Sequence, residues 1–170
     1  TSGAAVTVVL NTTSGTATGG DATGDTISNF EHVQGSGFAD SLTGDSSANA
    51  LAGNAGNDSL YGGTGADSLY GGADNDLLVG GAGNDLLDGG AGVDTVDYSA
   101  TAAAITVNLA TGAQTGGDGN DTLVAIENIF GTANNDSITG STADNLLSGG
   151  AGNDTILGGL GNDTISGGAG

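Results

Sequence analysis

Residues 80–88 read GGAGNDLLD, and this nine-residue block returns with small variations through much of the chain. Copies begin at Gly53, Gly62, Gly71, Gly80 and Gly89 and, after an interruption, at Gly131, Gly140, Gly149 and Gly158. Each copy has a carboxylate or amide at its sixth place and a large apolar residue at its eighth. Self-similarity at a fixed short period is typical of a solenoid in which each copy forms one small structural unit. The sequence therefore predicts an all-β solenoid built from turns and short strands.

The charge of the chain is as unusual as its period. Its 170 residues include 20 acidic side chains, one histidine and no lysine or arginine, which gives a formal net charge of −20. The counter-charge must come from outside, and hard divalent cations are the natural partners of oxygen ligands. If each Ca²⁺ offsets two charges, about ten ions would neutralise the chain. We expect no nucleic-acid partner, because nucleic acids are bound through Lys and Arg clusters.

Membrane insertion and cysteine chemistry are also not expected. No run approaches the roughly 18 apolar residues of a membrane span, and anionic membrane surfaces need basic side chains that are missing here. The sequence contains no cysteine, so neither disulfides nor thiolate metal sites can form.

A longer duplication contains the short blocks. AVTVVL at residues 5–10 recurs as AITVNL at residues 104–109, and GDTISNFEHV at 24–33 resembles NDTLVAIENI at 120–129. Departures from the consensus are copied as well: Glu31 matches Glu127, and Asn49 matches Asn145. We therefore expect one continuous solenoid of two units. The first unit is residues 1–97, with a strand and loop at 1–34 and a nonapeptide roll at 35–97. The second is residues 98–170, with a strand and loop at 98–130 and a roll at 131–170.

The segments between the nonapeptide runs are harder to assign. Alternation in residues 5–10 and 104–109 places Val6, Val8 and Leu10, or their equivalents, on one face of a strand. Residues 11–24 and 110–119 are rich in Thr, Gly, Ala and Asp and are predicted to be loops. A threefold apolar spacing at 123, 126 and 129 could suggest a helical turn, but flanking strand signals favour a bent coil.

The turn composition predicts calcium binding. Glycine at the first, second and fourth places permits positive φ, so successive carbonyl groups can face one point, and the sixth-place Asp adds a negative ligand. Ca²⁺ accepts six to eight oxygens with loose geometry, whereas Mg²⁺ demands a tight octahedron. The predicted metal ligands are Asp40, Asp58, Asp67, Asp76, Asp85, Asp94, Asp121, Asp136, Asp154 and Asp163. Asp25 occupies the place in the first unit that Asp121 has in the second.

The GGxGxD blocks and their strict register resemble the RTX family of secreted bacterial proteins. This resemblance implies a right-handed parallel β-roll, or β-helix, with calcium ions between its turns. It also implies that two blocks make one coil, so that turns on one side lie 18 residues apart and share ions. The implied location is extracellular or at the cell surface.

Two functions remain open. The first is a non-enzymatic, structural β-roll in a filament, surface layer or adhesin. In this role identical copies would join by end-to-end stacking or by tandem continuation, because the final GGAG stops about eight residues before a seamless restart of the unit. The second is an accessory module that helps a larger secreted RTX enzyme to fold after export, or holds a polysaccharide. Catalysis by the chain itself is not expected, because no nucleophile and base are paired.

Several individual residues outside the repeat consensus could have either a structural or a functional role. His32 is expected at the surface without a catalytic role, and Glu31 and Glu127 are expected to be structural ligands or hydrogen-bond acceptors. Tyr61 and Tyr70 fall at the ninth place of adjacent blocks, which should face outward on opposite faces of the roll. They could contact a glycan or a neighbouring roll, or simply face solvent.

Overall fold

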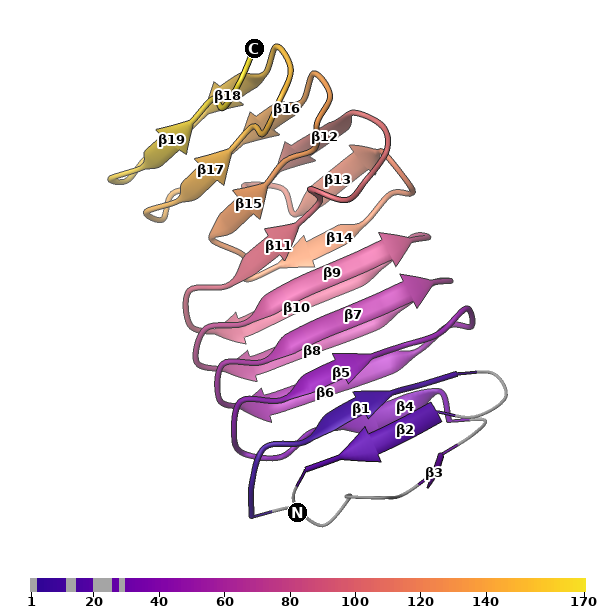
Figure 1. Cartoon of the computed structure of the whole chain (residues 1–170). Coiled ribbons are helices and arrows are strands. Elements are labelled where there is room, and N and C mark those ends of the chain that lie inside the picture. The colour runs from indigo at the N-terminus through magenta and orange to yellow at the C-terminus, as the bar shows by residue number, and fades with distance from the viewer. Residues whose placement is uncertain (1–2, 12–14, 20–25, 28–29) are drawn as a thin grey trace.

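A computed structural model describes residues 3–11, 15–19, 26–27 and 30–170 of the chain, and in these ranges it contains strands and turns but no helix. Accordingly, no helix of the described ranges is long and apolar enough to cross a membrane. The strands form two sheets that face each other and stack along one axis, from the indigo N-terminal end to the yellow C-terminal end in Figure 1. The predicted all-β solenoid is confirmed, and it is a parallel β-roll.

The first sheet has the order β19-β17-β15-β11-β9-β7-β5-β1-β2-β3 and the second has the order β18-β16-β12-β13-β14-β10-β8-β6-β4. The strands of the first unit are β1 (Thr7–Val9), β2 (Gly15–Thr18), β3 (Thr26–Ile27), β4 (His32–Gln34), β5 (Ser41–Thr43), β6 (Ala50–Ala55), β7 (Ser59–Thr64), β8 (Ser68–Ala73), β9 (Leu77–Ala82), β10 (Leu86–Ala91) and β11 (Thr95–Asp97). Those of the second are β12 (Ile105–Asn108), β13 (Ala113–Gly116), β14 (Thr122–Val124), β15 (Asn128–Phe130), β16 (Ser137–Thr139), β17 (Leu146–Ser148), β18 (Thr155–Leu157) and β19 (Thr164–Ser166).

Successive nonapeptides alternate between the two sheets, so one coil takes two blocks. Leu51 of β6 lies opposite Leu69 of β8, and Leu60 of β7 lies opposite Leu78 of β9, in parallel register. Each pair is 18 residues apart, as expected for two nine-residue blocks per coil. Equivalent residues therefore stack into columns that run along the axis of the roll.

The core is the column of eighth-place side chains. Leu51, Leu60, Leu69, Leu78 and Leu87 are each fully buried between the two sheets. Strand alternation points the seventh and ninth places away from this core, and Tyr61 and Tyr70 are 36% and 41% exposed. The outward prediction for these two tyrosines is confirmed.

The prediction of loops at residues 11–24 and 110–119 is wrong where the structure describes them. Strand β2 pairs antiparallel with β1, and β13 pairs antiparallel with β12, so each unit begins with a hairpin. The inward places of the returning strands hold Ala17 and Gln114, which are buried but are not large apolar residues. This is why the alternation of a half-buried strand was hidden in the sequence. Asp25 lies outside the described residues.

The second hairpin is inserted into the stack without breaking it. Strand β14 pairs in parallel with β10, and β15 pairs in parallel with β11, so the coil after the hairpin stacks directly on the coil before it. Leu123 of β14, Ile129 of β15 and Ile126 of the segment between these two strands are all buried there, and the chain bends at Ala125, where φ is 50°. The expectation of a bent coil rather than a helix is confirmed.

The core column makes a direct prediction about stability. Leu69→Ala should lower the free energy of unfolding of the calcium-bound chain by about 2–5 kcal/mol, because the neighbouring coils cannot collapse into the cavity. The neighbouring change Tyr70→Ala removes a larger but outward side chain and should cost much less. Urea denaturation in excess calcium measures both, and equal losses would contradict the assignment of the core column.

Candidate metal centre

The sixth-place carboxylates form ladders that run along the roll. The amide of Asp40 donates to Oδ1 of Asp58 at 2.7 Å, and the amide of Asp58 donates to Oδ1 of Asp76 at 2.8 Å. The same contact joins Asp67 to Asp85, Asp76 to Asp94, Asp136 to Asp154, Asn49 to Asp67, and Asn145 to Asp163. Every pair that was expected to be adjacent at 18 residues is brought together.

The other carboxylate oxygen of most of these residues has no protein partner. Within the described part of the chain, Oδ2 is buried and accepts no hydrogen bond in Asp58, Asp67, Asp76, Asp85, Asp94 and Asp154. Buried polar atoms are nearly always paired, because an unpaired one loses its hydration without compensation. Six such oxygens in equivalent places indicate a missing ligand of opposite charge.

The first glycine of each block makes room for that ligand. A Cβ atom on Gly62 would lie 2.5 Å from Oδ2 of Asp67 and 2.5 Å from the carbonyl oxygen of Gly80, which is on the next coil. A carboxylate oxygen and a carbonyl oxygen of successive coils therefore border the same space. The prediction of positive φ at this glycine is wrong for every block that begins at Gly53, Gly62, Gly71, Gly80, Gly89, Gly131, Gly140, Gly149 or Gly158, and holds only at Gly116, where φ is 90°. In the other blocks the role of the first glycine is to keep a side chain out of this space.

In the blocks of residues 53–97 and 149–166 positive φ occurs at the second and fourth places, as in Gly63 (106°) and Gly65 (125°). These angles are in the left-handed region that glycine adopts without a Cβ clash. Asn54, at the second place of its block, and Asp74, at the fourth place of its block, adopt the same left-handed region, with φ of 83° and 76°. Asn and Asp are the non-glycine residues that tolerate it best, so these departures from the consensus keep the geometry of the turn.

Burial makes the carboxylates hard to ionise without a cation. Desolvation is the main cause that raises the pKa of Asp58, Asp67 and Asp76 to about 6, and the charges of neighbouring acids add to it. The amide that donates to each carboxylate lowers the pKa but offsets only part of the effect. A bound cation would reverse this balance, since it stabilises the charged form.

The donor set fits calcium. Among the described residues, no three His, Cys, Asp or Glu side chains converge on one point. The atoms that border the space beside the first glycines are carboxylate Oδ2 and backbone carbonyl oxygens, an all-oxygen set without histidine or thiolate. Such a set suits Ca²⁺, whereas Zn²⁺ prefers nitrogen and sulfur.

Three of the ten predicted metal ligands, Asp40, Asp121 and Asp136, have no free carboxylate oxygen, because protein N–H or O–H groups donate to both of their oxygens. Asp40 accepts the amide and hydroxyl of Ser36, and Asp136 accepts the amide and hydroxyl of Thr132 at 2.6 and 2.9 Å. Asp121 accepts the Tyr98 hydroxyl at 2.9 Å. Burial and the nearby Asp121 raise the pKa of that tyrosine, which keeps its proton on the hydroxyl.

Glu127 accepts a hydrogen bond, as expected, whereas a second ladder was not expected from the sequence. Oε2 of Glu127 accepts the amide of Asp94 at 2.9 Å, so this glutamate stands in for an aspartate where the second unit joins the first. A second ladder runs outside through fifth-place amides: Asn75 donates its N–H to Oδ1 of Asn57 at 3.0 Å, and Val93 donates to Asn75 at 2.9 Å. The recurrence of Asn before Asp was the available signal. His32 is exposed, as expected.

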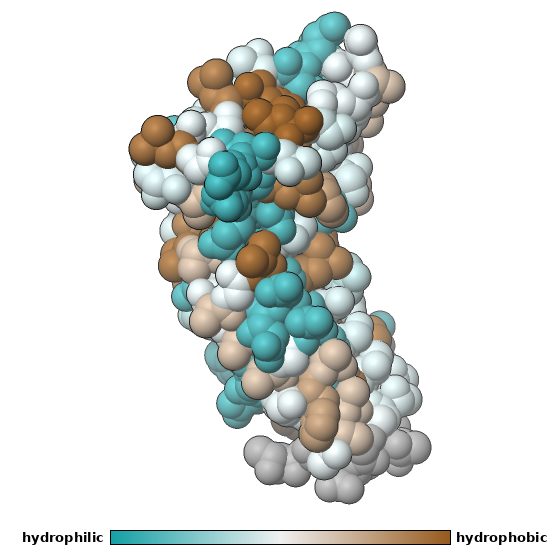
Figure 2. Space-filling model, turned by 90° about the vertical axis from the view of Figure 1, so that its left-hand side faces the viewer, coloured by the Kyte–Doolittle hydropathy of each residue, from teal (hydrophilic) through white to brown (hydrophobic). Residues whose placement is uncertain are grey.

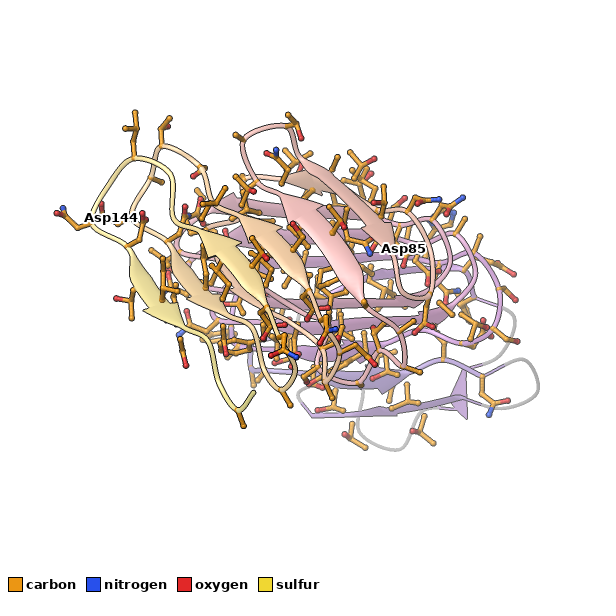
Figure 3. All side chains as sticks on the ribbon, turned by 90° about the horizontal axis from the view of Figure 1, so that it is seen from above. Asp85 and Asp144 are labelled. Atoms are coloured by element: carbon orange, nitrogen blue, oxygen red, sulfur yellow. The ribbon has the colours of Figure 1, made fainter. Side chains whose placement is uncertain are left out.

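The two ladders run in opposite directions. In the inner ladder the earlier coil donates to the later one, and in the outer ladder the later coil donates to the earlier one. Asp144, at the rim in Figure 3, belongs to the outer ladder and accepts the amide of Asn162 at 2.7 Å, whereas Asp85 lies among the stacked turns. Only the inner acids are therefore placed to share a buried cation.

Fold and turns together define a parallel β-roll with repeated oxygen-lined turns between coils. A family profile described as the RTX calcium-binding nonapeptide repeat matches residues 30–60, 43–78, 61–96, 115–125, 126–156 and 139–170. These matches cover well over half of the chain, and the chain belongs to the RTX calcium-binding nonapeptide repeat family. The family implies that the ligand is Ca²⁺. No curated protein matches the chain.

The raised pKa values predict how the metal-free chain responds to acid. Below about pH 6 the folded state binds more protons than an unfolded chain, whose aspartates titrate near 3.8. Stability of the metal-free fold should therefore increase as the pH falls from 7 through 6, and this contribution should be complete below about pH 4. Far-ultraviolet circular dichroism of calcium-stripped protein should show β content increasing on acidification. The double variant Asp67→Asn, Asp76→Asn should show a smaller increase, and a loss of β content in the wild type over this range would contradict the prediction.

Proposed function

We propose that this chain is a non-enzymatic, structural β-roll that folds around calcium outside the cell. The observation that carries the proposal is the set of buried, unpartnered Oδ2 atoms in a chain without lysine or arginine. Left bare, these carboxylates would repel one another across successive coils. With divalent cations between the coils, the same side chains hold the stack together.

The principal calcium ligands in this proposal are the carboxylates whose Oδ2 is free. They are Asp58, Asp67, Asp76, Asp85, Asp94 and Asp154, and Asp163 takes the equivalent place in the last coil. Carbonyl groups of first-place glycines, such as Gly80 beside Asp67, supply neutral oxygen. When bound, the ion supplies positive charge and coordination to several oxygens. The two units, residues 1–97 and 98–170, share this arrangement.

The expected affinity supports an extracellular role. One carboxylate per turn with neutral carbonyl groups is a low-charge ligand set, and extracellular calcium modules bind with dissociation constants on the order of 0.1–1 mM. Cytosolic calcium would leave such sites empty, while millimolar external calcium would fill them. Folding coupled to calcium would then take place after export.

The surface of the last coil supports stacking of a further copy of the unit. Ile165 is 49% exposed, although its counterpart before the second unit, Val96, is fully buried opposite Ile129 of β15. Leu157 and Leu160 are 60% and 69% exposed. Figure 2 shows hydrophobic surface most strongly near this end, while hydrophilic patches follow the length of the roll. The internal junction, β14 and β15 on β10 and β11, is a template for how a second copy would cover the end.

The first experiment is a calcium titration of the full chain. Circular dichroism should show largely unfolded protein in EDTA and a cooperative gain of β structure with calcium in the range of about 0.1–1 mM, but not with equal magnesium. Asp76→Asn should raise the calcium midpoint several-fold, because it removes a buried ligand charge. Asp118→Asn, an exposed acid outside the inner ladder, is the matched control and should leave the midpoint nearly unchanged. Full β content in EDTA at pH 7 would refute the proposal.

The second experiment tests stacking. Sedimentation velocity in millimolar calcium should show concentration-dependent assemblies that dissociate in EDTA. Ile165→Asp places a charge on the exposed end and should shift the equilibrium to monomer, whereas Tyr70→Asp, at similar exposure on the side of the roll, should not. A wild-type chain that stays monomeric at high concentration would contradict end-to-end association.

A further inference from the structure

The nonapeptide turns of residues 35–97 and 131–166 are of two kinds, and the second place distinguishes them; the turn at Gly116, where Tyr98 donates to Asp121, belongs to neither run. In one kind, called open turns here, the second residue has positive φ, from 83° at Asn54 to 117° at Gly72. The open turns begin at Gly53, Gly62, Gly71, Gly80, Gly89, Gly149 and Gly158. In the other kind, called closed turns, the second residue is Ser36, Asp45, Thr132 or Ser141, and none of these has positive φ. The closed turns begin at Gly35, Gly44, Gly131 and Gly140.

In every closed turn the second residue donates its backbone N–H to the sixth side chain. Thr132 donates to Oδ2 of Asp136 at 2.6 Å, and Ser141 donates to Oδ1 of Asn145 at 2.7 Å. Ser36 and Asp45 make the same bond to Asp40 and Asn49. The hydroxyl groups of Ser36, Thr132 and Ser141 donate to the same carboxyl or amide group. The oxygen that is free in the open turns is therefore occupied by protein donors.

The residue at the sixth place agrees with this division. Both turns that carry a neutral Asn there, Asn49 and Asn145, are closed, while every open turn carries an Asp. A neutral amide can close a turn through hydrogen bonds, but it brings no charge to attract a cation. The sequence thus keeps the carboxylate wherever the turn leaves its oxygen free.

Strand lengths reflect the same difference in the first unit, whereas β17 and β18, which lead into the open turns at Gly149 and Gly158, also stop after three residues. The strands that lead into closed turns, β4, β5, β15 and β16, stop after three residues. Those that lead into the open turns of the first unit run for six residues and include the second-place residue, as in β7 and β9, where Gly63 lies opposite Gly81. A second-place residue in this register lies opposite its counterpart on the neighbouring coil, and Oδ2 of the carboxylate in its own block accepts no hydrogen bond.

We propose that calcium occupies only the open turns, and that the four closed turns are held by protein donors in place of the ion. This inference rests on the proposed calcium role and assigns which turns carry it. The closed turns come in pairs, and each pair follows the hairpin that starts a unit: Asp40 also accepts the amide of Val6, and Asp136 accepts the amide of Ile105. Each unit therefore begins with a metal-free coil and continues into metal-bound ones.

The test compares Asp40→Asn with Asp58→Asn. The two aspartates are neighbours in one ladder, both are buried, and both accept an amide at Oδ1. Equilibrium dialysis with radioactive calcium at saturation counts the ions bound to the full chain, and circular dichroism confirms that each variant is folded. Asp40→Asn should bind as many ions as the wild type, and Asp58→Asn should bind at least one fewer.

A reciprocal variant tests for gain of a site. The double substitution Thr132→Gly, Asn134→Gly converts GTANND at residues 131–136 into GGAGND, which is the sequence of the open turn at residues 80–85. This variant should bind one more ion than the wild type, whereas Thr132→Ser, which keeps the hydroxyl group, should bind the same number.

The outcomes separate this inference from the proposed function. Loss of an ion in Asp40→Asn equal to that in Asp58→Asn would overturn the division into two kinds of turn while leaving the calcium role intact. An unchanged count in the folded glycine variant would also overturn it. A wild-type chain that binds no calcium would instead remove the proposed function itself.

Discussion

The structure depends on one constraint: carboxylates are buried between coils in a chain that has no lysine or arginine to pair with them. Their Oδ1 atoms are satisfied by amides of the preceding coil, which fixes the height of each coil against the next. Their Oδ2 atoms accept no hydrogen bond, and burial raises the pKa of carboxyl groups such as that of Asp67. Hydrogen bonding therefore sets the register of the stack, while the remaining electrostatic penalty makes the stack conditional on a cation.

Burial of the apolar core does not remove the need for a cation between the coils. Each block buries one large side chain, which is worth roughly 1.5–3 kcal/mol, while ordering a single residue costs roughly 1–2 kcal/mol of backbone entropy. Glycine increases the entropic cost, since it loses the most freedom on folding. The glycines cannot be exchanged for better-behaved residues, because a Cβ on Gly62 would enter the space beside Asp67 Oδ2. The features that create the oxygen-lined turn are thus the same ones that make the metal-free chain weak.

Much of this architecture could be predicted from the period alone. A nine-residue repeat with one large apolar residue fixed the inward column from Leu51 to Leu87 and the 18-residue pairing of Asp58 with Asp76. The hairpins were missed because Ala17 and Gln114 replace the large inward residues that identify a strand. The role of the first glycine was misjudged because its reason is steric, and only the position of the next coil shows it. The closure of the turns by Ser36 and Thr132 depends on the direction of one N–H, which residue type alone does not determine.

Two of the four closed turns, those of Asp40 and Asp136, lie directly against a hairpin strand. An open turn borders the space it shares with the turn of an adjacent coil, as Asp67 does with Gly80. The coil that holds Asp40 lies against the hairpin strand β1, and the coil that holds Asp136 lies against β12. From each side one backbone amide, that of Val6 or Ile105, donates to the carboxylate. Asp40 and Asp136 also border the first-place carbonyl group of the following coil, from Gly53 and Gly149, as Asp67 does. What distinguishes the two closed turns is the N–H and O–H that their own block donates to the carboxylate. At such a boundary the carboxylate is satisfied from within its own block, and a serine or threonine at the second place does so with an N–H and an O–H.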